Sequence, residues 1–389
     1  MKKCPNCGCM DLESFYSVQD VPVNSCLMLD SPQDAIKYPT GNINLCFCNH
    51  CSFIFNSRYL EYLIEYSTRY EDQQGYSTTF NAFQYALTEE LVTTYKLHYK
   101  TILEIGCGKG DFLKLICQMG NNKGIGIDPA INTERFTNGD QIDIDLYPEC
   151  YSQKHASLRP DFICCRHTLE HIQNTRGFVK TIRNALDNQS NIMIFIEVPD
   201  TTRVLKNICF QDIYYEHCSY FLPGSLAYLF ESCGFQIEDI RQVYDRQYLL
   251  LFATANSKNQ LHTDKIQIQQ IKELVNNFSI KVHEKILYWK ETISNYQHRD
   301  KNIVIWGSGS KCVAFINALN MNMNNVEIVD INPHKQGKFM PGIARQIKSP
   351  ESIDMRGIDL IVIMNKIYEQ EIREGTGKNS SNIDFLALD

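Results

Sequence analysis

The stretch Thr101-Ile-Leu-Glu-Ile-Gly-Cys-Gly-Lys-Gly110, followed by Asp111-Phe-Leu-Lys-Leu-Ile116, decides the fold. Its apolar first half predicts a short buried strand, and its glycines predict a tight turn with a bare backbone. Apolar residues from Phe112 to Met119 then recur at the spacing of a helix. A strand, a glycine turn and a helix in this order are typical of α/β domains that bind a nucleotide-like ligand at the turn.

The spacing of the glycines indicates which ligand the turn favours. A dinucleotide fingerprint requires Gly-x-Gly-x-x-Gly, whereas here Asp111 stands where the third glycine should be. The carboxylates of Glu104 and Asp111 would repel a pyrophosphate and attract a cation. Glycines at a turn are also common without any ligand, but an acid on the first strand and another at the end of the second make ligand binding the stronger interpretation.

With these residues in view, the glycine loop resembles motif I of the class I S-adenosylmethionine (SAM) methyltransferases. By this resemblance Glu104 helps to hold the methionine moiety of SAM, and Asp128, at the end of the second strand, takes the two ribose hydroxyls. His167 follows a later strand and faces the same crevice of the predicted sheet. The residues predicted to bind SAM are Glu104, Gly106, Gly108, Gly110, Asp128 and His167.

The whole chain narrows the class of protein further. Its 389 residues suffice for two or three domains, and a net charge of −7 provides no basic surface of the kind that binds nucleic acid. No apolar run approaches the ~20 residues of a membrane span, and the N-terminus leads into no signal-peptide core. We therefore expect a cytoplasmic protein without nucleic-acid or membrane partners, and the oligomeric state stays open.

Two Cys-x-x-Cys knuckles near the N-terminus predict a structural zinc site. Four thiolates on two turns can surround one tetrahedral ion, and four protein ligands leave no open position for catalysis. The predicted ligands are Cys4, Cys7, Cys48 and Cys51. Cys9, Cys26, Cys46 and His50 lie close by as alternative ligands, and reduced cysteines without metal are the competing interpretation. The chain has sixteen cysteines in total, and most of those outside this group are interpreted as buried apolar residues.

The chain divides into three predicted parts. These are a zinc-binding domain at 1–57, a methyltransferase domain with a helical lead-in at 58–257, and a connecting helix with a second Rossmann-like domain at 258–389. In the lead-in, Tyr70 and Tyr76 flank a polar turn and are candidates for lining a pocket. Residues 235–243 and 248–253 predict an antiparallel pair at the edge of the methyltransferase sheet.

The densest titratable stretch is Asp212-Ile-Tyr-Tyr-Glu-His-Cys-Ser-Tyr-Phe221. It offers a base, His217, beside a carboxylate, Glu216, with phenol groups before and after them. A lone histidine would usually be a structural residue. This cluster follows a strand that ends at the cofactor crevice, and its position favours catalysis.

A second nucleotide-like unit begins at Asn302-Ile-Val-Ile-Trp-Gly-Ser-Gly-Ser-Lys311. The order is again strand, glycine turn, helix and strand, with Asp330 at the end of the second strand. Lys311 and the amides at the helix N-terminus suit a phosphate group better than a sulfonium. A Rossmann-like domain without any ligand is the alternative for so short a glycine signal.

The chain as a whole resembles the three-part sugar C-methyltransferases, relatives of enzymes that methylate C-3 of nucleotide-linked 4-keto-deoxysugars. The resemblance rests on both cysteine knuckles, the glycine loop, Arg-His-Thr-Leu-Glu-His at 166–171, Tyr-Glu-His at 215–217, and Val-Asp-Ile-Asn-Pro-His-Lys-Gln-Gly-Lys-Phe-Met-Pro-Gly at 329–342. It implies that His217 is the catalytic base and that Glu216 and Tyr214 assist it. It further implies that the small-molecule substrate, a nucleotide-sugar, is bound by Tyr70, Tyr76, Tyr215, Ser308 and Lys311.

Two segments differ from enzymes of known sugar specificity in this group. A Gly-Tyr-Gly-Ala type of turn is replaced here by Trp306-Gly-Ser-Gly-Ser310, and a tryptophan-asparagine pair is replaced by Met364-Asn-Lys-Ile-Tyr368. Methylation of an oxygen or nitrogen atom, on a sugar or another small metabolite, is therefore the alternative to carbon methylation. A non-catalytic binding protein that keeps the fold is an alternative of another class.

Overall fold

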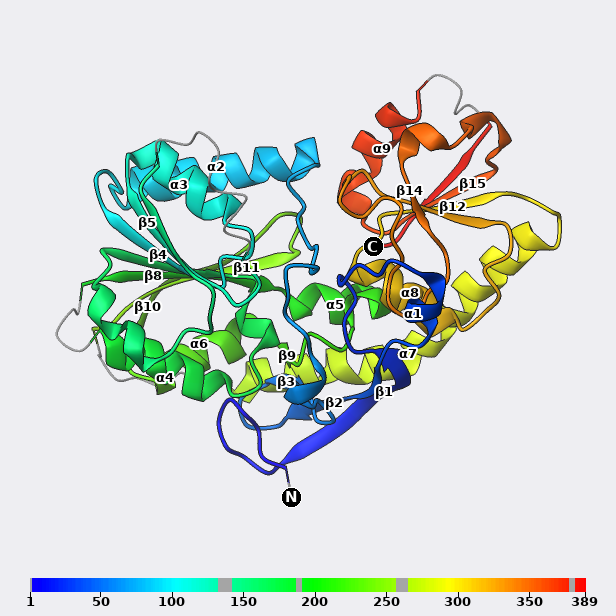
Figure 1. Ribbon diagram of the computed structural model, residues 1–389. Coiled ribbons are helices and arrows are strands. Elements are labelled where there is room, and N and C mark those ends of the chain that lie inside the picture. The colour runs from blue at the N-terminus through cyan, green and yellow to red at the C-terminus, as the bar shows by residue number, and fades with distance from the viewer. Residues whose placement is uncertain (1, 132–141, 187–190, 257–264, 378–381) are drawn as a thin grey trace.

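The computed structural model describes residues 2–131, 142–186, 191–256, 265–377 and 382–389. Two α/β units stand side by side, a small antiparallel sheet lies below them, and the long helix α7 (Lys265–Gln297) runs from one unit to the other (Figure 1). The predicted boundary at residues 257 and 258 falls outside the described residues. None of the described helices combines the length and the apolar character that crossing a bilayer requires.

The methyltransferase unit is built on a seven-stranded sheet. Its order is β10-β11-β8-β7-β4-β5-β6, in which β6, β5, β4, β7 and β8 are parallel. The predicted antiparallel pair is confirmed, since β10 pairs with β11 and β11 pairs with β8. The strands are β4 (Thr101–Ile105), β5 (Lys123–Ile127), β6 (Ile144–Tyr147), β7 (Phe162–Arg166), β8 (Met193–Pro199), β10 (Gln236–Val243) and β11 (Tyr248–Thr254).

Helices cover both faces of this sheet (Figure 1). One apolar cluster packs α2 (Thr78–Thr94) and α3 (Asp111–Gly120) on one face. A second cluster packs α4 (Thr175–Ala185) and α6 (Pro223–Ser232) on the other. The short helix α5 (Thr201–Asn207) follows β8, and its first turn is capped by Asp200. The predicted α/β class is thus confirmed.

The N-terminal part forms a four-stranded sheet in the order β1-β2-β3-β9. Its strands are β1 (Leu12–Pro22), β2 (Thr40–Cys48), β3 (Ile54–Asn56) and β9 (Ser219–Tyr220), and helix α1 (Pro32–Ile36) lies between the first two. The pairs are antiparallel, and Ile54 faces Tyr220. The fourth strand is therefore supplied by the segment that carries the predicted catalytic residues.

The C-terminal unit is a five-stranded parallel sheet in the order β14-β13-β12-β15-β16. Helix α8 (Ser310–Leu319) follows the first strand directly, as the sequence predicted, and α9 (Glu369–Gly375) precedes the last. The strands are β12 (Ile303–Trp306), β13 (Val326–Val329), β14 (Ile347–Lys348), β15 (Leu360–Ile363) and β16 (Asp384–Ala387).

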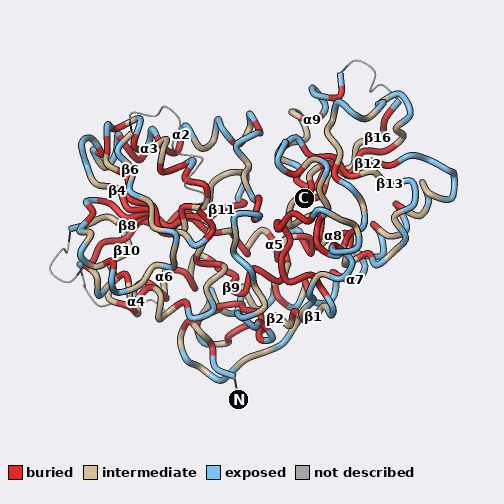
Figure 2. Tube along the Cα trace, viewed as in Figure 1, coloured by how far each residue is buried: buried red, intermediate tan, exposed pale blue. Residues whose placement is uncertain are grey.

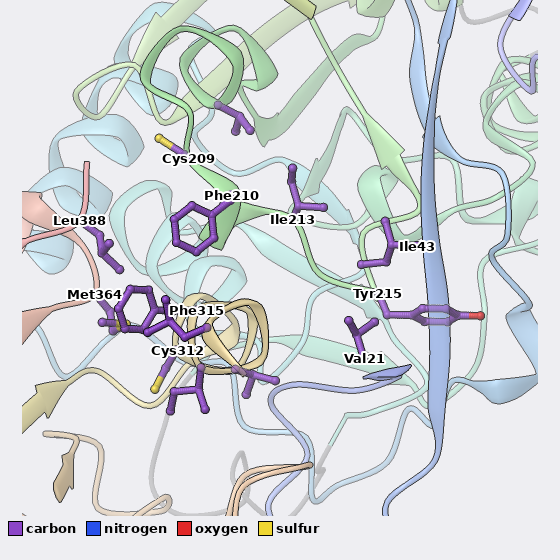
Figure 3. Packing of buried hydrophobic residues seen from close by; sticks show 14 of the residues in the cluster. Val21, Ile43, Cys209, Phe210, Ile213, Tyr215, Cys312, Phe315, Met364 and Leu388 are labelled. Atoms are coloured by element: carbon purple, nitrogen blue, oxygen red, sulfur yellow. The ribbon is translucent and has the colours of Figure 1, made fainter. Parts of the chain in front are cut away.

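One apolar cluster joins the three parts. Phe210, before β9, stacks on Phe315 of α8, and Trp289 of α7 meets the same ring edge-on. Val21 and Ile43 of the N-terminal sheet belong to this cluster as well (Figure 3). Buried residues accordingly follow the seven-stranded and the five-stranded sheets and also fill the junction beside α8 (Figure 2). The parts are packed against each other through a shared core.

Candidate active site and cysteine cluster

The glycine loop between β4 and α3 is closed on one side and open on the other. A methyl group on the Cα of Gly106 (φ +73°) would come 1.9 Å from Oγ1 of Thr168. A methyl group on the Cα of Gly108 (φ +54°) would have no described atom within 4 Å. Both backbones adopt the left-handed conformation that glycine tolerates best. The loop therefore leaves free space at Gly108, next to the exposed backbone.

Two carboxylates border this space. Glu104 is 3% exposed, and its Oε2 has no hydrogen-bond partner among the described residues. Burial raises the pKa of Glu104 to about 8, although the nearby Arg166 opposes the shift. Asp128 accepts hydrogen bonds from the amides of Gly108 (2.9 Å) and Ala130 (2.7 Å). An orphaned buried carboxylate oxygen fits a ligand that brings an ammonium group, and SAM is such a ligand.

His167 lies at the carboxyl end of β7 with φ at 48°, a left-handed conformation that is uncommon for a residue with a side chain. Its ring nitrogens lie 3.6 Å from Glu170 Oε1 and 3.5 Å from Glu197 Oε1. Burial lowers the pKa of His167, but these carboxylates outweigh burial and raise it to about 9. Arg166 donates to Glu197 as well, at 2.5 Å. A charged network thus lies at the carboxyl end of β7.

The tyrosine-rich lead-in is attached to the glycine loop. Lys109, within the loop, donates from Nζ to the carbonyl of Ala130 at 3.2 Å and to that of Thr68 at 3.5 Å. Gln73 donates to the carboxylate of Asp111 at the start of α3. The polar turn that the sequence singled out therefore lies next to the predicted SAM site.

Two histidines and two tyrosines form a group beyond this turn. The hydroxyl of Tyr214 lies 2.9 Å from Nε2 of His217, and their ring centroids are 4.1 Å apart. The ring of His171 meets that of His217 edge-on at 4.8 Å, and Tyr66 lies 6.2 Å from His171. Burial, together with the nearby His171, His167 and Lys311, holds the pKa of His217 well below its usual value. His217 is therefore a neutral imidazole with a phenol as its partner.

Glu216 makes its hydrogen bonds outside this group, and its assisting role beside His217 stays a prediction. Its carboxylate accepts hydrogen bonds from the amide of Ser25 (2.9 Å), the hydroxyl of Ser25 and Nδ2 of Asn24 (3.2 Å). No hydrogen bond joins Glu216 to His217 within the described part of the chain. Ser25 also bonds to Ser310 of α8 at 2.9 Å. Glu216 thus connects the methyltransferase unit to the N-terminal loop and, through Ser25, to the C-terminal unit.

Two predicted substrate residues belong to the protein interior instead. Tyr215 is 1% exposed among the apolar residues of the shared core, and its hydroxyl accepts from the amide of Leu60 at 3.0 Å (Figure 3). Ser308 is completely buried, and both its amide and its hydroxyl donate to Asp330, at 2.8 and 2.7 Å. Each side chain makes a structural contact in the described part of the chain, and its role in substrate binding stays a prediction.

The other predicted substrate residues, Tyr70, Tyr76 and Lys311, differ in how far they are buried and in what they contact. Tyr70 is nearly buried against Leu27 and Cys26, and its ring contacts Tyr66 at 5.9 Å. Tyr76 is half-exposed and lies 6.0 Å from His334 of the C-terminal unit. Lys311 forms an ion pair with Asp212 at 2.5 Å.

The four predicted zinc ligands gather in one place. Sγ of Cys4 lies 3.7 Å from Sγ of Cys51, and Sγ of Cys7 lies 3.5 Å from Sγ of Cys48. A tetrahedron with ~2.3 Å zinc–sulfur bonds has edges of about 3.8 Å. The amide of Cys9 also donates to Sγ of Cys7 at 3.4 Å. The four cysteines form a cluster that could hold a metal ion.

Sequence reasoning left several neighbours of His217 outside the predicted site. His171 stands in the Arg-His-Thr-Leu-Glu-His segment, but nothing in that segment indicates that its ring meets His217. Glu170 of the same segment is the carboxylate that lies near both imidazoles. Nothing in the sequence around Ser25 signals its contact with Glu216, because the two residues are far apart along the chain.

Comparison with known proteins gives matches to two domain families. Residues 80–240 match the methyltransferase domain family, and residues 257–382 match the family called the C-methyltransferase C-terminal domain. The chain is 25% identical over 290 residues to the C-methyltransferase NovU of Streptomyces niveus, an overlap that covers 70% of this chain and 67% of NovU.

Solved structures overlap with part of the chain only. The magnesium protoporphyrin IX methyltransferase of Synechocystis PCC 6803, with bound S-adenosylhomocysteine, is 16% identical, with a TM-score of 0.34, covering 45% of this chain and 83% of that one. The 1,6-didemethyltoxoflavin-N1-methyltransferase of Burkholderia thailandensis is 14% identical, with a TM-score of 0.35. The overlap covers 47% of this chain and 84% of that one.

The fold, the glycine loop with its two carboxylates and the matching domain family define a SAM-dependent methyltransferase. The second domain match makes the assignment more specific. Its domain is the C-terminal domain of C-methyltransferases, and together with the similarity to NovU the two matches support the C-methyltransferase family predicted from the sequence.

Proposed function

We propose that the protein transfers a methyl group from SAM to a carbon atom of a nucleotide-linked keto-deoxysugar, with His217 as the general base. The observation that carries this proposal is the pair formed by His217 and Tyr214, 2.9 Å apart. The pair lies between the lead-in, the methyltransferase sheet and the C-terminal unit. The C-methyltransferase domain at 257–382 and the relative NovU support carbon as the acceptor.

In the proposed reaction, different residues of the chain have different roles. SAM, when bound, supplies an electrophilic methyl group, and Glu104 and Asp128 would hold it against the glycine loop. His217 takes the proton from the carbon next to the ketone of the sugar. The Tyr214 hydroxyl is placed to stabilise the negative oxygen that develops as this proton leaves. Orientation of the acceptor carbon toward the methyl group supplies the remaining rate enhancement.

A substitution at His217 tests the assignment of the base. His217→Asn should lower kcat by at least about a hundredfold on the true substrate, with SAM affinity unchanged by calorimetry. His98→Asn is the matched control, because His98 is exposed on the loop before β4. Near-full activity of the His217 variant would remove histidine from the mechanism.

The acceptor atom is tested by the product itself. Incubation with SAM labelled with ¹³C in the methyl group and with nucleotide-linked 4-keto-deoxysugars should give a methyl resonance bonded to carbon in the NMR spectrum. A methyl group bonded to oxygen or nitrogen would contradict the proposal while leaving the methyltransferase class intact.

We further propose that the cluster of Cys4, Cys7, Cys48 and Cys51 holds a structural Zn²⁺. Four thiolates with sulfur separations of 3.5 and 3.7 Å suit the geometry of this ion. Protein purified without chelator should contain one zinc per chain at this site. Cys48→Ser should lose it, whereas Cys150→Ser, at an exposed cysteine, should keep it. A zinc content near zero in the unmodified protein would refute this assignment.

A further inference from the structure

Outside the cysteine cluster, one more group of potential metal ligands exists among the described residues. It consists of Glu170, His171 and His217, whose ligand atoms all lie within 4.8 Å of one another. Glu170 and His171 end the 3₁₀ helix Leu169–His171, and His217 precedes β9. The amide of Cys218 donates to the carbonyl of Glu170 at 3.0 Å. Backbone bonding therefore fixes the two segments against each other.

Two buried polar atoms of this group have no hydrogen-bond partner among the described residues. Glu170 is 1% exposed, and its Oε2 accepts no hydrogen bond from any described residue. Nδ1 of His171 is likewise buried without a partner in the described chain. Buried polar atoms are almost always satisfied, so an orphaned carboxylate oxygen beside an orphaned imidazole nitrogen indicates room for a cation. His167, at 3.6 Å, faces only the other oxygen of Glu170.

We propose that Glu170, His171 and His217 bind a divalent transition ion of the Zn²⁺, Co²⁺ or Ni²⁺ type. Two imidazoles and one carboxylate are the ligands that these ions prefer, whereas Mg²⁺ and Ca²⁺ favour oxygen ligands alone. Bonds of ~2.0–2.1 Å require ligand atoms about 3.3 Å apart. The proposed site therefore requires side-chain rotations that bring the three ligand atoms closer together than in the structure.

The charges around the group set the expected strength of binding. His167 and Lys311 bring positive charge toward His217, which opposes a second cation. Three ligands with opposing charges nearby bind more weakly than four thiolates. The site therefore fills only after the cysteine cluster, and chelators empty it first.

Occupancy has a consequence for catalysis that rests on the function proposed above. An ion bound to the imidazole of His217 takes the lone pair that would accept the substrate proton. The group is then an inhibitory metal site inside the catalytic centre. Free transition ions should lower methyl transfer reversibly, and a chelator should restore it.

Cobalt binding tests the site without any measurement of turnover. Protein carrying one zinc in its cysteine cluster is titrated with Co²⁺ and followed by visible absorption and by metal analysis. We expect one further Co²⁺ per chain, with a spectrum of nitrogen and oxygen ligands. Glu170→Gln and His171→Asn should each weaken this binding at least about tenfold. His98→Asn should leave it unchanged.

Folding and function are separated by two further measurements. SAM binding and thermal unfolding of each variant show whether the fold is intact. Absence of a second cobalt in the unmodified protein, or its retention at full affinity in both the Glu170 and His171 variants, overturns the metal site. Methyl transfer without cobalt binding refutes only this site. Cobalt binding by a protein that methylates no keto-sugar even after a chelator has removed the cobalt refutes only the proposed function.

Discussion

At the scale of single residues, neighbours in the segment 214–217 have different environments. Tyr214, Tyr215, Glu216 and His217 are consecutive, yet only the first and last meet each other. Tyr215 enters the shared core, and Glu216 reaches the N-terminal loop. Proximity in sequence predicted a single catalytic cluster, because a pattern of residue types does not reveal which way each side chain turns.

The two tyrosines provide a matched pair of substitutions. Tyr214→Phe should lower kcat at least about tenfold and leave the melting temperature nearly unchanged, because its hydroxyl serves His217. Tyr215→Phe should keep kcat and reduce the free energy of unfolding by about 1 kcal/mol, because the amide of Leu60 loses its acceptor. Steady-state kinetics and thermal unfolding measure both. A lower kcat in Tyr215→Phe, with kcat unchanged in Tyr214→Phe, would instead place Tyr215 in the active site.

Glu104 gives SAM binding a dependence on pH. Burial raises the pKa of its carboxyl group to about 8, so at pH 7 the free protein carries this group mostly protonated. A bound cationic ligand favours the carboxylate, which lowers that pKa and releases a proton. SAM affinity should therefore increase as the pH rises from 6 to 8.

Calorimetry at pH 7 in buffers of different ionisation enthalpy should detect this proton release. Glu104→Gln should abolish it and weaken SAM binding about tenfold or more. Equal proton release by the Gln variant would show that the proton comes from another group, such as the amine of SAM.

At the scale of elements, the C-terminal unit supplies a cap to a helix of the methyltransferase unit. Glu371 of α9 accepts from the hydroxyl of Ser77 (2.7 Å) and from the amides of Thr78 (3.0 Å) and Thr79 (3.2 Å) at the start of α2. A carboxylate at this end satisfies free amides and interacts favourably with the helix dipole. The cap ties α9 to the end of the lead-in.

Removal of this cap should therefore destabilise the whole protein. Glu371→Ala should reduce the free energy of unfolding by about 1 kcal/mol, measured by thermal or denaturant unfolding. Glu369→Ala is the control, because Glu369 pairs only locally with Arg373 within α9. Equal losses in the two variants would contradict a role for the cap between units.

Elements with local signals were predictable, and those with distant contacts were not. The glycine turn and α3 follow directly from glycine spacing and helical periodicity, and so do β12 and α8 in the second unit. The loop at 24–29 has no comparable pattern. Its position depends on Glu216, Ser310 and Phe339, each remote in sequence. Tertiary contacts of this kind produce no periodic pattern in the amino-acid sequence.

At the scale of the whole molecule, the cysteine cluster and the methyltransferase sheet share one apolar cluster. Cys48 and Cys51 pack in it with Phe53, and Phe221 and Phe230 belong to the other side. Phe53 and Phe221 have ring centroids 5.2 Å apart. A metal ion at the cysteines would consequently support the part of the protein that binds SAM.

Metal removal should then affect more than the N-terminal sheet. Treatment with a strong chelator should lower the melting temperature of the protein by at least about 5 °C, because a ligand that binds only the folded state is lost. Differential scanning calorimetry should show a single shifted transition, and added Zn²⁺ should restore it. A separate early transition, with the main one unmoved, would show that the N-terminal sheet unfolds independently.

The position of β9 has a consequence for how the chain folds during synthesis. The N-terminal sheet is complete only when Ser219 and Tyr220 reach β3. A ribosome must therefore translate most of the methyltransferase unit before the earliest sheet can close. Long-range pairing of this kind slows folding and leaves an unpaired strand edge exposed in the meantime. The nascent chain should thus depend on chaperones most strongly in the interval before the catalytic segment emerges.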